Sequence, residues 1–399
     1  MGEFTHLGAY SDWAAARLAV QSALRAGAAR CGLAGSPATV RATVKGLLDV
    51  PDAPEQPGDV QMGERWERDG VAGLELSWSV GYGPRTQAWL LRPADATGPL
   101  PGVLALHGHD GHKFYGKEKI ADGPRPDHAG PPGQAGQAGQ VGALRDGLYG
   151  GRAFASDLAR QGFTVLVPDV FGWGSRRFPY AEMPALVRRL AESTRDVIPP
   201  DPLPHAGPEE AAVYNTAAWH HEHLIAKYCT LLGTSLAAVV SAEDRAAAGY
   251  LRSRPDVAGP VGCVGLSGGG CRAALLAATC DGIAAAVVAG MMSSYAALVD
   301  HSVIDHTWML FPPGLGDVAD WPDLAACHAP VPLLVQYNRD DELFPLEGQR
   351  QADERIAQHY AAVDEPDRYL GRFYDGGHKF DVPMQRDAFG WLRQQLAGR

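Results

Sequence analysis

The sequence predicts an α/β protein built on a mostly parallel β-sheet. Short runs of apolar and β-branched residues alternate with Ala- and Leu-rich helical patterns through most of the chain. The first two runs are joined by a Gly- and Pro-containing turn at residues 81–84, which is typical of an antiparallel hairpin. A leading hairpin followed by alternating strands and helices predicts a mostly parallel sheet of eight strands that is covered by helices.

Each expected element is bounded by turn residues or by a change of hydrophobic period. The eight strands are expected at residues 71–80, 85–91, 102–106, 163–168, 261–266, 283–289, 332–337 and 368–374. Helical patterns are expected at residues 11–29, 39–48, 152–161, 236–251, 271–279, 347–360 and 382–396.

The N-terminal part of the chain, residues 1–70, is expected to form a helical lead-in that packs on the main domain. Its first helical pattern begins at a pair of N-capping residues, Ser11 and Asp12. Several prolines make the stretch that follows irregular. The main domain is expected to comprise residues 71–399.

Two segments interrupt the alternation of strands and helices. Residues 124–142 contain the run GPPGQAGQAGQVG, which is typical of a surface loop. Residues 176–235 form a long insertion after the fourth expected strand and contain the cluster WHHEH at residues 219–223. Ligands bind at the carboxyl ends of the strands in such sheets, so we expect this insertion to cover the binding site as a lid.

Composition and charge restrict the classes of partner. The net charge of −11 argues against nucleic acid and against an anionic membrane as partners. No run of about 18 uncharged apolar residues is present, and the N-terminus shows no signal-peptide pattern, so no membrane span is expected. The six cysteines are scattered without C-x-x-C pairing, which favours free thiols in a cytoplasmic protein. The composition is compatible with a monomer and with a homo-oligomer.

One stretch, PVGCVGLSGGGCRAALLAA at residues 260–278, joins an expected strand to an expected helix through the pattern G-x-S-x-G. In this context the pattern places a serine, here Ser267, on a sharp and strained turn with its hydroxyl exposed. Gly265 and Gly269 supply the small neighbours that the turn requires, and the amide of Gly268 would point at a developing oxyanion. The alternative is a Gly-rich turn that binds a phosphate, although no Lys-Ser/Thr follows it as in a P-loop.

A nucleophilic serine needs a base, and the base needs an acid that orients it. His378 lies on a Gly-rich turn after the eighth expected strand. Asp341 follows the seventh strand, with Asp340 as the alternative acid. Ser, Asp and His follow one another in this order along the chain, each after an expected strand, as in a catalytic triad whose serine lies on a G-x-S-x-G turn. We therefore predict Ser267, Asp341 and His378 as the catalytic residues.

The loop after the third expected strand reads HGHDG and is expected to supply the second oxyanion donor, the amide of His109. Trp173 and Arg176, just past the fourth strand, are expected to line the substrate pocket together with Trp219 of the insertion. Trp173 could instead pack beneath the lid. The basic run that contains Lys117 and Lys119 is expected on a solvated or lid-contacting surface.

A metal site is the alternative interpretation of the same loop, because His107, His109, Asp110 and His112 are all ligand types. A hydrolytic zinc site needs three converging ligands and an open position, whereas this loop already has a role as oxyanion donor. We therefore expect no metal and no cofactor.

The motifs HGHDG, DVFGWGS, GLSGG, DELFP and GGH, each placed after an expected strand, resemble those of the α/β-hydrolase superfamily. The resemblance covers residues 71–399 and is closest to the dienelactone hydrolase and acetyl xylan esterase-like branch. It implies an α/β-hydrolase fold and carboxylic-ester hydrolysis without a cofactor. Dienelactone hydrolases use a cysteine nucleophile, whereas residue 267 is a serine, which favours esterase-like chemistry.

The sequence therefore predicts a serine hydrolase that cleaves a small-molecule carboxylic ester or lactone through an acyl-enzyme. Three alternatives remain. The same machinery could transfer the acyl group to an alcohol or amine, it could act as a peptidase or amidase, or the scaffold could bind a ligand without catalysis.

Overall fold

The computed structural model describes residues 4–30, 36–50, 53–124, 136–194, 209–298 and 303–396. These residues form one nine-stranded sheet in the order β1-β2-β3-β5-β4-β6-β7-β8-β9. The strands are β1 (Gly58–Arg68), β2 (Val71–Ser79), β3 (Thr86–Pro93), β4 (Leu100–Leu106), β5 (Thr164–Pro168), β6 (Val257–Leu266), β7 (Ile283–Ala289), β8 (Leu333–Asn338) and β9 (Tyr369–Tyr374).

The sheet is antiparallel at one end and parallel through the rest. β1, β2, β3 and β5 pair antiparallel, whereas β5, β4 and β6 to β9 pair parallel. The carboxyl ends of the parallel strands therefore lie along one edge, which is where this type of sheet binds ligands.

Eight of the nine strands coincide with the eight predicted strands, and the ninth is β1, which the sequence analysis missed. β1 lies within residues 1–70, so that segment is not helical throughout. Most of its side chains are exposed, and its pairing with β2 is interrupted by irregular register. An edge strand of this kind carries no apolar run, and periodicity therefore does not reveal it.

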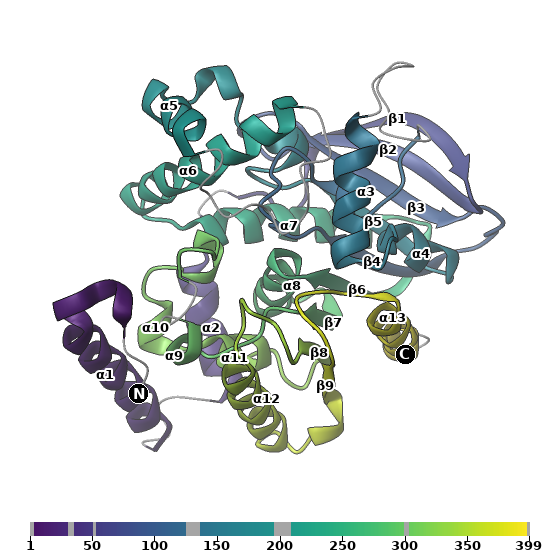
Figure 1. The fold of residues 1–399 in the computed structure, drawn as a ribbon. Coiled ribbons are helices and arrows are strands. Elements are labelled where there is room, and N and C mark those ends of the chain that lie inside the picture. The colour runs from purple at the N-terminus through teal and green to yellow at the C-terminus, as the bar shows by residue number, and fades with distance from the viewer. Residues whose placement is uncertain are drawn as a thin grey trace.

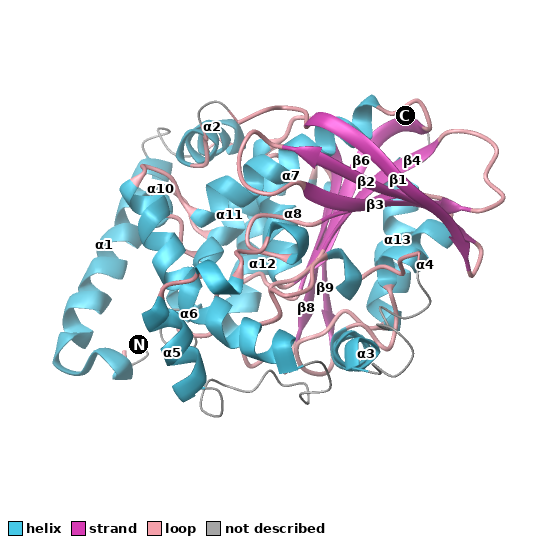
Figure 2. Ribbon diagram, turned by 90° about the horizontal axis from the view of Figure 1, so that it is seen from above, coloured by secondary structure: helices cyan, strands magenta, loops and turns pink. Residues whose placement is uncertain are grey.

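Helices cover both faces of the sheet, as Figure 2 shows, with α4 and α13 on one side and α7, α8 and α11 on the other. The longer helices are α1 (Ser11–Arg30), α2 (Pro37–Leu47), α3 (Gly136–Leu148), α4 (Phe154–Arg160), α5 (Ala185–Thr194), α6 (Glu209–Leu231), α7 (Leu236–Ser253), α8 (Gly268–Thr279), α11 (Trp321–Ala326), α12 (Leu346–Ala361) and α13 (Val382–Leu396). Each face has its own buried cluster of aliphatic and aromatic side chains.

The two segments that interrupt the alternation contain helices. α3 begins at Gly136, so residues 136–142 are helical and not a loop as predicted, while residues 125–135 lie outside the described part. Gln and Ala in this run are compatible with a helix despite its glycines. The predicted lid, residues 176–235, contains α5 and α6, which pack against each other on the side of the molecule away from α12 (Figure 1). Residues 195–208 of this segment lie outside the described part.

None of the described helices is by itself long and apolar enough to span a membrane, although α6 and α7 pass this test as a pair bent by 86°.

Candidate active site

Ser267 occupies a strained turn between β6 and α8. Its backbone has φ 56° and ψ −121°, a conformation that residues with a side chain rarely adopt and that costs about 1–3 kcal/mol. The Ser267 amide donates to the carbonyl of Ala289 on β7 at 2.9 Å, and the Ser267 carbonyl accepts from the amide of Cys271 at 2.8 Å. The strand on one side and the helix on the other therefore hold the serine in this conformation.

The neighbouring glycines are required by space, as the sequence pattern indicates. A Cβ on Gly265 would lie 2.4 Å from the backbone of Gly269, and a Cβ on Gly269 would lie 2.1 Å from the carbonyl oxygen of Leu106. Both distances are far below van der Waals contact. β6, the start of α8 and the end of β4 can thus approach closely only because these two positions lack a side chain.

The loop after β4, residues 107–113, lies directly against this turn, and we call it the β4 loop. A Cβ on Gly268 would lie 2.5 Å from the amide nitrogen of His109. The structure therefore brings together the residues of the two predicted oxyanion donors, Gly268 and His109, beside Ser267.

His378 and Asp341 form a close pair at the ends of β9 and β8. Nδ1 of His378 lies 2.7 Å from Oδ2 of Asp341, whose side chain is only 1% exposed. The other carboxylate oxygen of Asp341 accepts from the amide of Leu343 at 3.0 Å. Asp340, the alternative acid, instead accepts from the amide of Gly376 at 2.9 Å. The geometry thus favours Asp341 as the partner of the histidine.

The pair also changes the ionisation of the imidazole. Burial by itself would lower the pKa of His378, but the charge and hydrogen bond of Asp341, helped by the charge of Asp110, outweigh burial and raise this pKa above its ordinary value. With Nδ1 directed at a carboxylate, Nε2 is the nitrogen left to accept a proton.

His378 lies beside the turn that carries Ser267. A Cβ on Gly290, the residue after β7, would lie 2.7 Å from Cδ1 of Leu266 and 3.5 Å from Cε1 of His378. Among the described residues, no hydrogen bond joins Ser267 Oγ to the His378 ring. Catalytic hydrogen bonds are often long without substrate and shorten when it binds.

The three predicted pocket residues occupy different surroundings. Trp173 is buried and contacts the β4 loop, with its ring 5.5 Å from that of His109. This position agrees with the alternative that Trp173 packs beneath the lid. Trp219, on α6, lies half-buried with its ring 5.0 Å from that of His223.

Arg176 is also buried, and its guanidinium is engaged within the protein. It pairs with Glu243 of α7 and donates to the carbonyls of Tyr82 and Pro84. These contacts give Arg176 a role in holding the loop after β5 against the β2–β3 turn, and its place in a substrate pocket stays a prediction.

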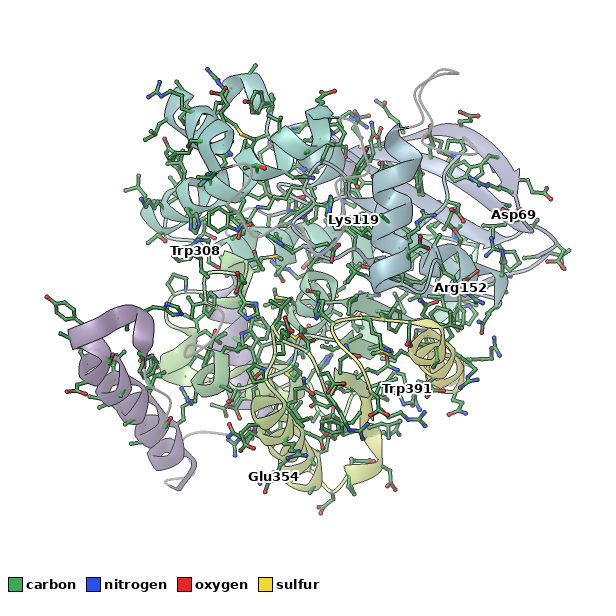
Figure 3. The ribbon with its side chains drawn as sticks, in the orientation of Figure 1. Asp69, Lys119, Arg152, Trp308, Glu354 and Trp391 are labelled. Carbon is green, nitrogen blue, oxygen red and sulfur yellow. The ribbon has the colours of Figure 1, made fainter. Side chains whose placement is uncertain are left out.

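The basic run after the β4 loop is not solvated. Lys119 is 0% exposed, pairs with Asp110 at 2.9 Å and donates to the carbonyls of Gly108 and His112 at 2.5 and 3.1 Å. It lies next to α3 (Figure 3). We expected a solvated or lid-contacting surface, and the solvated alternative is wrong for Lys119, because its charge is neutralised inside the protein and its ammonium group fixes the carbonyls of the β4 loop.

Lys117 is buried as well, so the solvated alternative of the expected solvated or lid-contacting surface is wrong for it too. Its ammonium lies 3.0 Å from Oδ2 of Asp169, at the end of β5. The available sequence signal was an acidic residue close after a buried strand, four residues past β4 at Asp110 and directly past β5 at Asp169, since each such carboxylate needs a cation when it is covered.

Sequence reasoning also missed the importance of Glu222, the acidic residue within the WHHEH cluster of α6. Its carboxylate is buried and accepts hydrogen bonds from His109 and from Thr307, which lies in the long connection after β7. No group of three or more His, Cys, Asp or Glu side chains in the described ranges is arranged to hold a metal ion.

Comparisons with known proteins agree with this architecture. No family model matches the chain. A curated Bacillus subtilis protein, "Putative hydrolase YtaP", is 22% identical over 352 residues, which cover 88% of this chain and 96% of that protein.

Solved structures share the fold at low sequence identity. A structure named "putative acetyl xylan esterase" from Bacteroides fragilis has a TM-score of 0.58 and 14% identity, over 84% of this chain and 73% of that chain. A glucuronoyl esterase from Solibacter usitatus has a TM-score of 0.57 and 12% identity, over 89% and 92%. Acetyl xylan esterase 1 from a Thermoanaerobacterium species has a TM-score of 0.51 and 16% identity, over 89% and 92%. The strand order, the turn at Ser267 and these similarities together show that the chain has the α/β-hydrolase fold.

Proposed function

We propose that this protein is a serine esterase that hydrolyses a small-molecule carboxylic ester through an acyl-enzyme. One observation carries the proposal. Ser267 sits in a strained turn against which the β4 loop and the His378–Asp341 pair both pack. This proximity supports the proposal, because ester hydrolysis by a serine needs a nucleophile, an oriented base and two amide donors around one reacting carbonyl.

In the proposed mechanism, Nε2 of His378 accepts the proton of the Ser267 hydroxyl as Oγ attacks the ester carbonyl. The amides of Gly268 and His109 donate hydrogen bonds to the oxyanion that forms, and each such donor typically contributes about 3 kcal/mol to the barrier reduction. His378 then protonates the leaving alcohol. A water molecule, deprotonated by the same imidazole, attacks the acyl-enzyme and releases the acid.

An ester on a carbohydrate is the substrate class that we propose to assay first. One structural neighbour is named an acetyl xylan esterase, another a "putative acetyl xylan esterase" and a third a glucuronoyl esterase, all at low identity. Aromatic rings lie on the described part of the predicted lid, at Trp219, and beside it, at Trp308 in the connection after β7. Trp308, which is 41% exposed, lies against α6 (Figure 3), where His223 separates it from Trp219. Exposed aromatic faces of this kind suit contact with sugar rings.

The test compares the wild-type protein with Ser267→Ala. We expect the wild type to hydrolyse p-nitrophenyl acetate and acetylated xylo-oligosaccharides, and to be labelled once by a fluorophosphonate. Ser267→Ala should lose at least about 10³-fold in kcat and should not be labelled, because no other group in the proposed mechanism can form the acyl bond.

The melting temperature and circular dichroism of Ser267→Ala provide the control for folding. Full labelling of a folded Ser267→Ala protein would show that the nucleophile is another residue. Wild-type protein that neither hydrolyses esters nor reacts with the fluorophosphonate would exclude the esterase function itself.

A further inference from the structure

Glu222 is a buried carboxylate of the lid helix α6 that lies outside the proposed catalytic set. Its side chain is 5% exposed. Oε2 accepts from Nε2 of His109 at 3.2 Å and from Nζ of Lys113. Oε1 accepts from Oγ1 of Thr307 and from the amide of Trp308, both at 2.7 Å. A carboxylate offers about four acceptor positions, so these four donors occupy it completely.

The carboxylate is held in its charged form. Burial would raise the pKa of Glu222, but the ammonium of Lys113 and the hydrogen bond from His109 hold this pKa well below its ordinary value. Lys113 is itself buried, and its ammonium lies 4.6 Å from the centre of the Trp173 ring. A charged network that is shielded from water in this way is stronger than the same contacts at the surface.

The network also fixes the tautomer of His109. The amide of Gly111 donates to Nδ1 of His109 at 3.2 Å, so Nδ1 carries no proton when the ring is neutral. The ring proton is then on Nε2, where it is donated to Glu222, an assignment that follows from the hydrogen-bond partners. Glu222 and the Gly111 amide therefore hold both nitrogens of the ring, and with them the orientation of His109.

The orientation of His109 matters because its amide nitrogen faces Gly268, 2.5 Å from where a Cβ would stand. The β4 loop is thus fixed from two directions. Lys119 holds the carbonyls of the loop from the interior, and Glu222 holds the His109 side chain from the lid.

We propose that Glu222 is a positioning residue that joins the lid helix and the Thr307–Trp308 turn to the β4 loop, so that the oxyanion site is complete only when α6 is docked. This inference rests on the proposed esterase function, in which the His109 amide binds the oxyanion. A donor displaced by about 1 Å can cost about 100-fold in rate, so the lid would control catalysis through the β4 loop.

The decisive experiment is a double-mutant cycle of Glu222→Met and Lys113→Met. We expect Glu222→Met to lower kcat for p-nitrophenyl acetate at least about 10-fold with little change in KM, because oxyanion binding acts in the transition state. Its melting temperature should also fall, since Lys113 is left buried without its partner. The double variant should regain melting temperature, because two apolar side chains replace the ion pair, but it should not regain kcat.

A structural role alone makes a different prediction for the cycle. If Glu222 serves only to neutralise Lys113, the double variant regains kcat together with melting temperature, and the inference is wrong. Amide hydrogen exchange of residues 107–113 gives a second measurement that does not depend on turnover. We expect faster exchange in Glu222→Met and in the double variant, and unchanged exchange would overturn the inference even if no ester were hydrolysed.

Asp323 of α11 provides a matched control. It is also a buried carboxylate, and it accepts from Nε2 of His359 at 2.6 Å, from Nε of Arg355 at 2.7 Å and from the amide of Asp320 at 3.0 Å. Asp323→Asn should lower the melting temperature and leave kcat unchanged. Glu222→Gln is a milder change that can be used if Glu222→Met does not fold, and it should lower kcat. Equal kcat in Glu222→Gln and the wild type would overturn the inference, while Ser267→Ala reports separately on the proposed function.

Discussion

Ser267, Asp341 and His378 follow strands β6, β8 and β9 closely, whereas Glu222 and Thr307 approach the same region from an inserted helix and a long connection. The parallel pairing of the strands sets the relative positions of the first group. The second group is positioned by buried hydrogen bonds and an ion pair. We refer to the two groups as the strand side and the lid side of the site.

This difference has a consequence for how each side responds to change. Backbone hydrogen bonds across a sheet are numerous, so a single substitution on the strand side removes a chemical group without moving its neighbours. The lid side depends on a few charged contacts that exclude water, and removal of one partner leaves another buried charge uncompensated. We therefore expect substitutions on the strand side to remove a reacting group while the structure is kept, and substitutions on the lid side to displace residues and lower stability.

The largest effect on the strand side is expected from Asp341→Asn. The amide would hydrogen-bond the wrong tautomer of His378 and would not stabilise the imidazolium, which costs about 10⁴-fold in kcat in a comparable triad. Steady-state kinetics with p-nitrophenyl acetate measures this loss. The melting temperature should change little because the amide has the shape of the carboxylate.

Asp340→Asn is the matched control for this prediction. Asp340 accepts from Gly376 in the loop that carries His378, so its replacement should reduce kcat by less than about 10-fold. If Asp340→Asn reduced kcat more than Asp341→Asn, Asp340 and not Asp341 would be the acid that orients His378.

A smaller but distinct effect is expected from Lys119→Met, which removes the interior support of the β4 loop. The Asp110 carboxylate would remain buried without its cation, and breaking a buried pair in this way costs about 3–5 kcal/mol of unfolding free energy. Urea denaturation measures the change. Lys45→Met is the control, because Lys45 pairs with Asp281 at the surface and should contribute less than about 1 kcal/mol.

If Lys119→Met and Lys45→Met lose similar stability, the Lys119–Asp110 pair does not support the loop energetically. Recovery of stability in Lys119→Met by a second substitution, Asp110→Asn, would strengthen the assignment, since the uncompensated charge would then be absent.

The strand side could be predicted from the sequence, because its signals are local. Strands β2 to β8 are short runs rich in buried apolar residues, and the edge strand β9 is a short run of mostly half-buried ones. Ser267 lies in a five-residue pattern in which a side chain on either outer glycine would clash with neighbouring backbone. β1 could not be predicted in the same way, because its exposed polar residues form no apolar run and its pairing with β2 defines it as a strand. The order of these signals predicted the mostly parallel sheet, and the resemblance of the motifs after its strands implied the α/β-hydrolase fold.

The lid side could not be predicted, because its signals are pairs of residues that lie far apart in the chain. Glu222 meets Lys113 across 109 positions and Thr307 across 85, and no pattern within α6 identifies either partner. Lys117 and Lys119 were expected on a solvated or lid-contacting surface, because the carboxylates that neutralise them inside the protein are visible only in three dimensions. Charged residues whose partners are supplied by folding are the part of a site that local patterns describe least well.

The smallest expected effect is the pH dependence of kcat/KM. It distinguishes the two sides because His378 and Glu222 titrate in different pH ranges. In the proposed mechanism activity requires a neutral His378, whose pKa is raised by Asp341 and Asp110. We therefore expect kcat/KM to fall as pH decreases through this pKa, by about tenfold per unit below it. His306, which faces His378 across the ring of Phe344, has its pKa lowered to about 4 by burial and stays neutral over this range.

The contributions of His378 and Glu222 to folding stability depend on pH in opposite directions. The raised pKa of His378 favours the folded state below the ordinary value of 6.5, and this contribution is lost as pH rises through the folded-state pKa. The pKa of Glu222 is lowered, so its contribution is present above the ordinary value of 4.5 and is lost as pH falls towards its folded-state pKa. The acid limb of kcat/KM above pH 5 should therefore follow a single proton, that of His378. A two-proton slope there would mean that the lid side also titrates, and the charged state assigned to Glu222 would then be wrong.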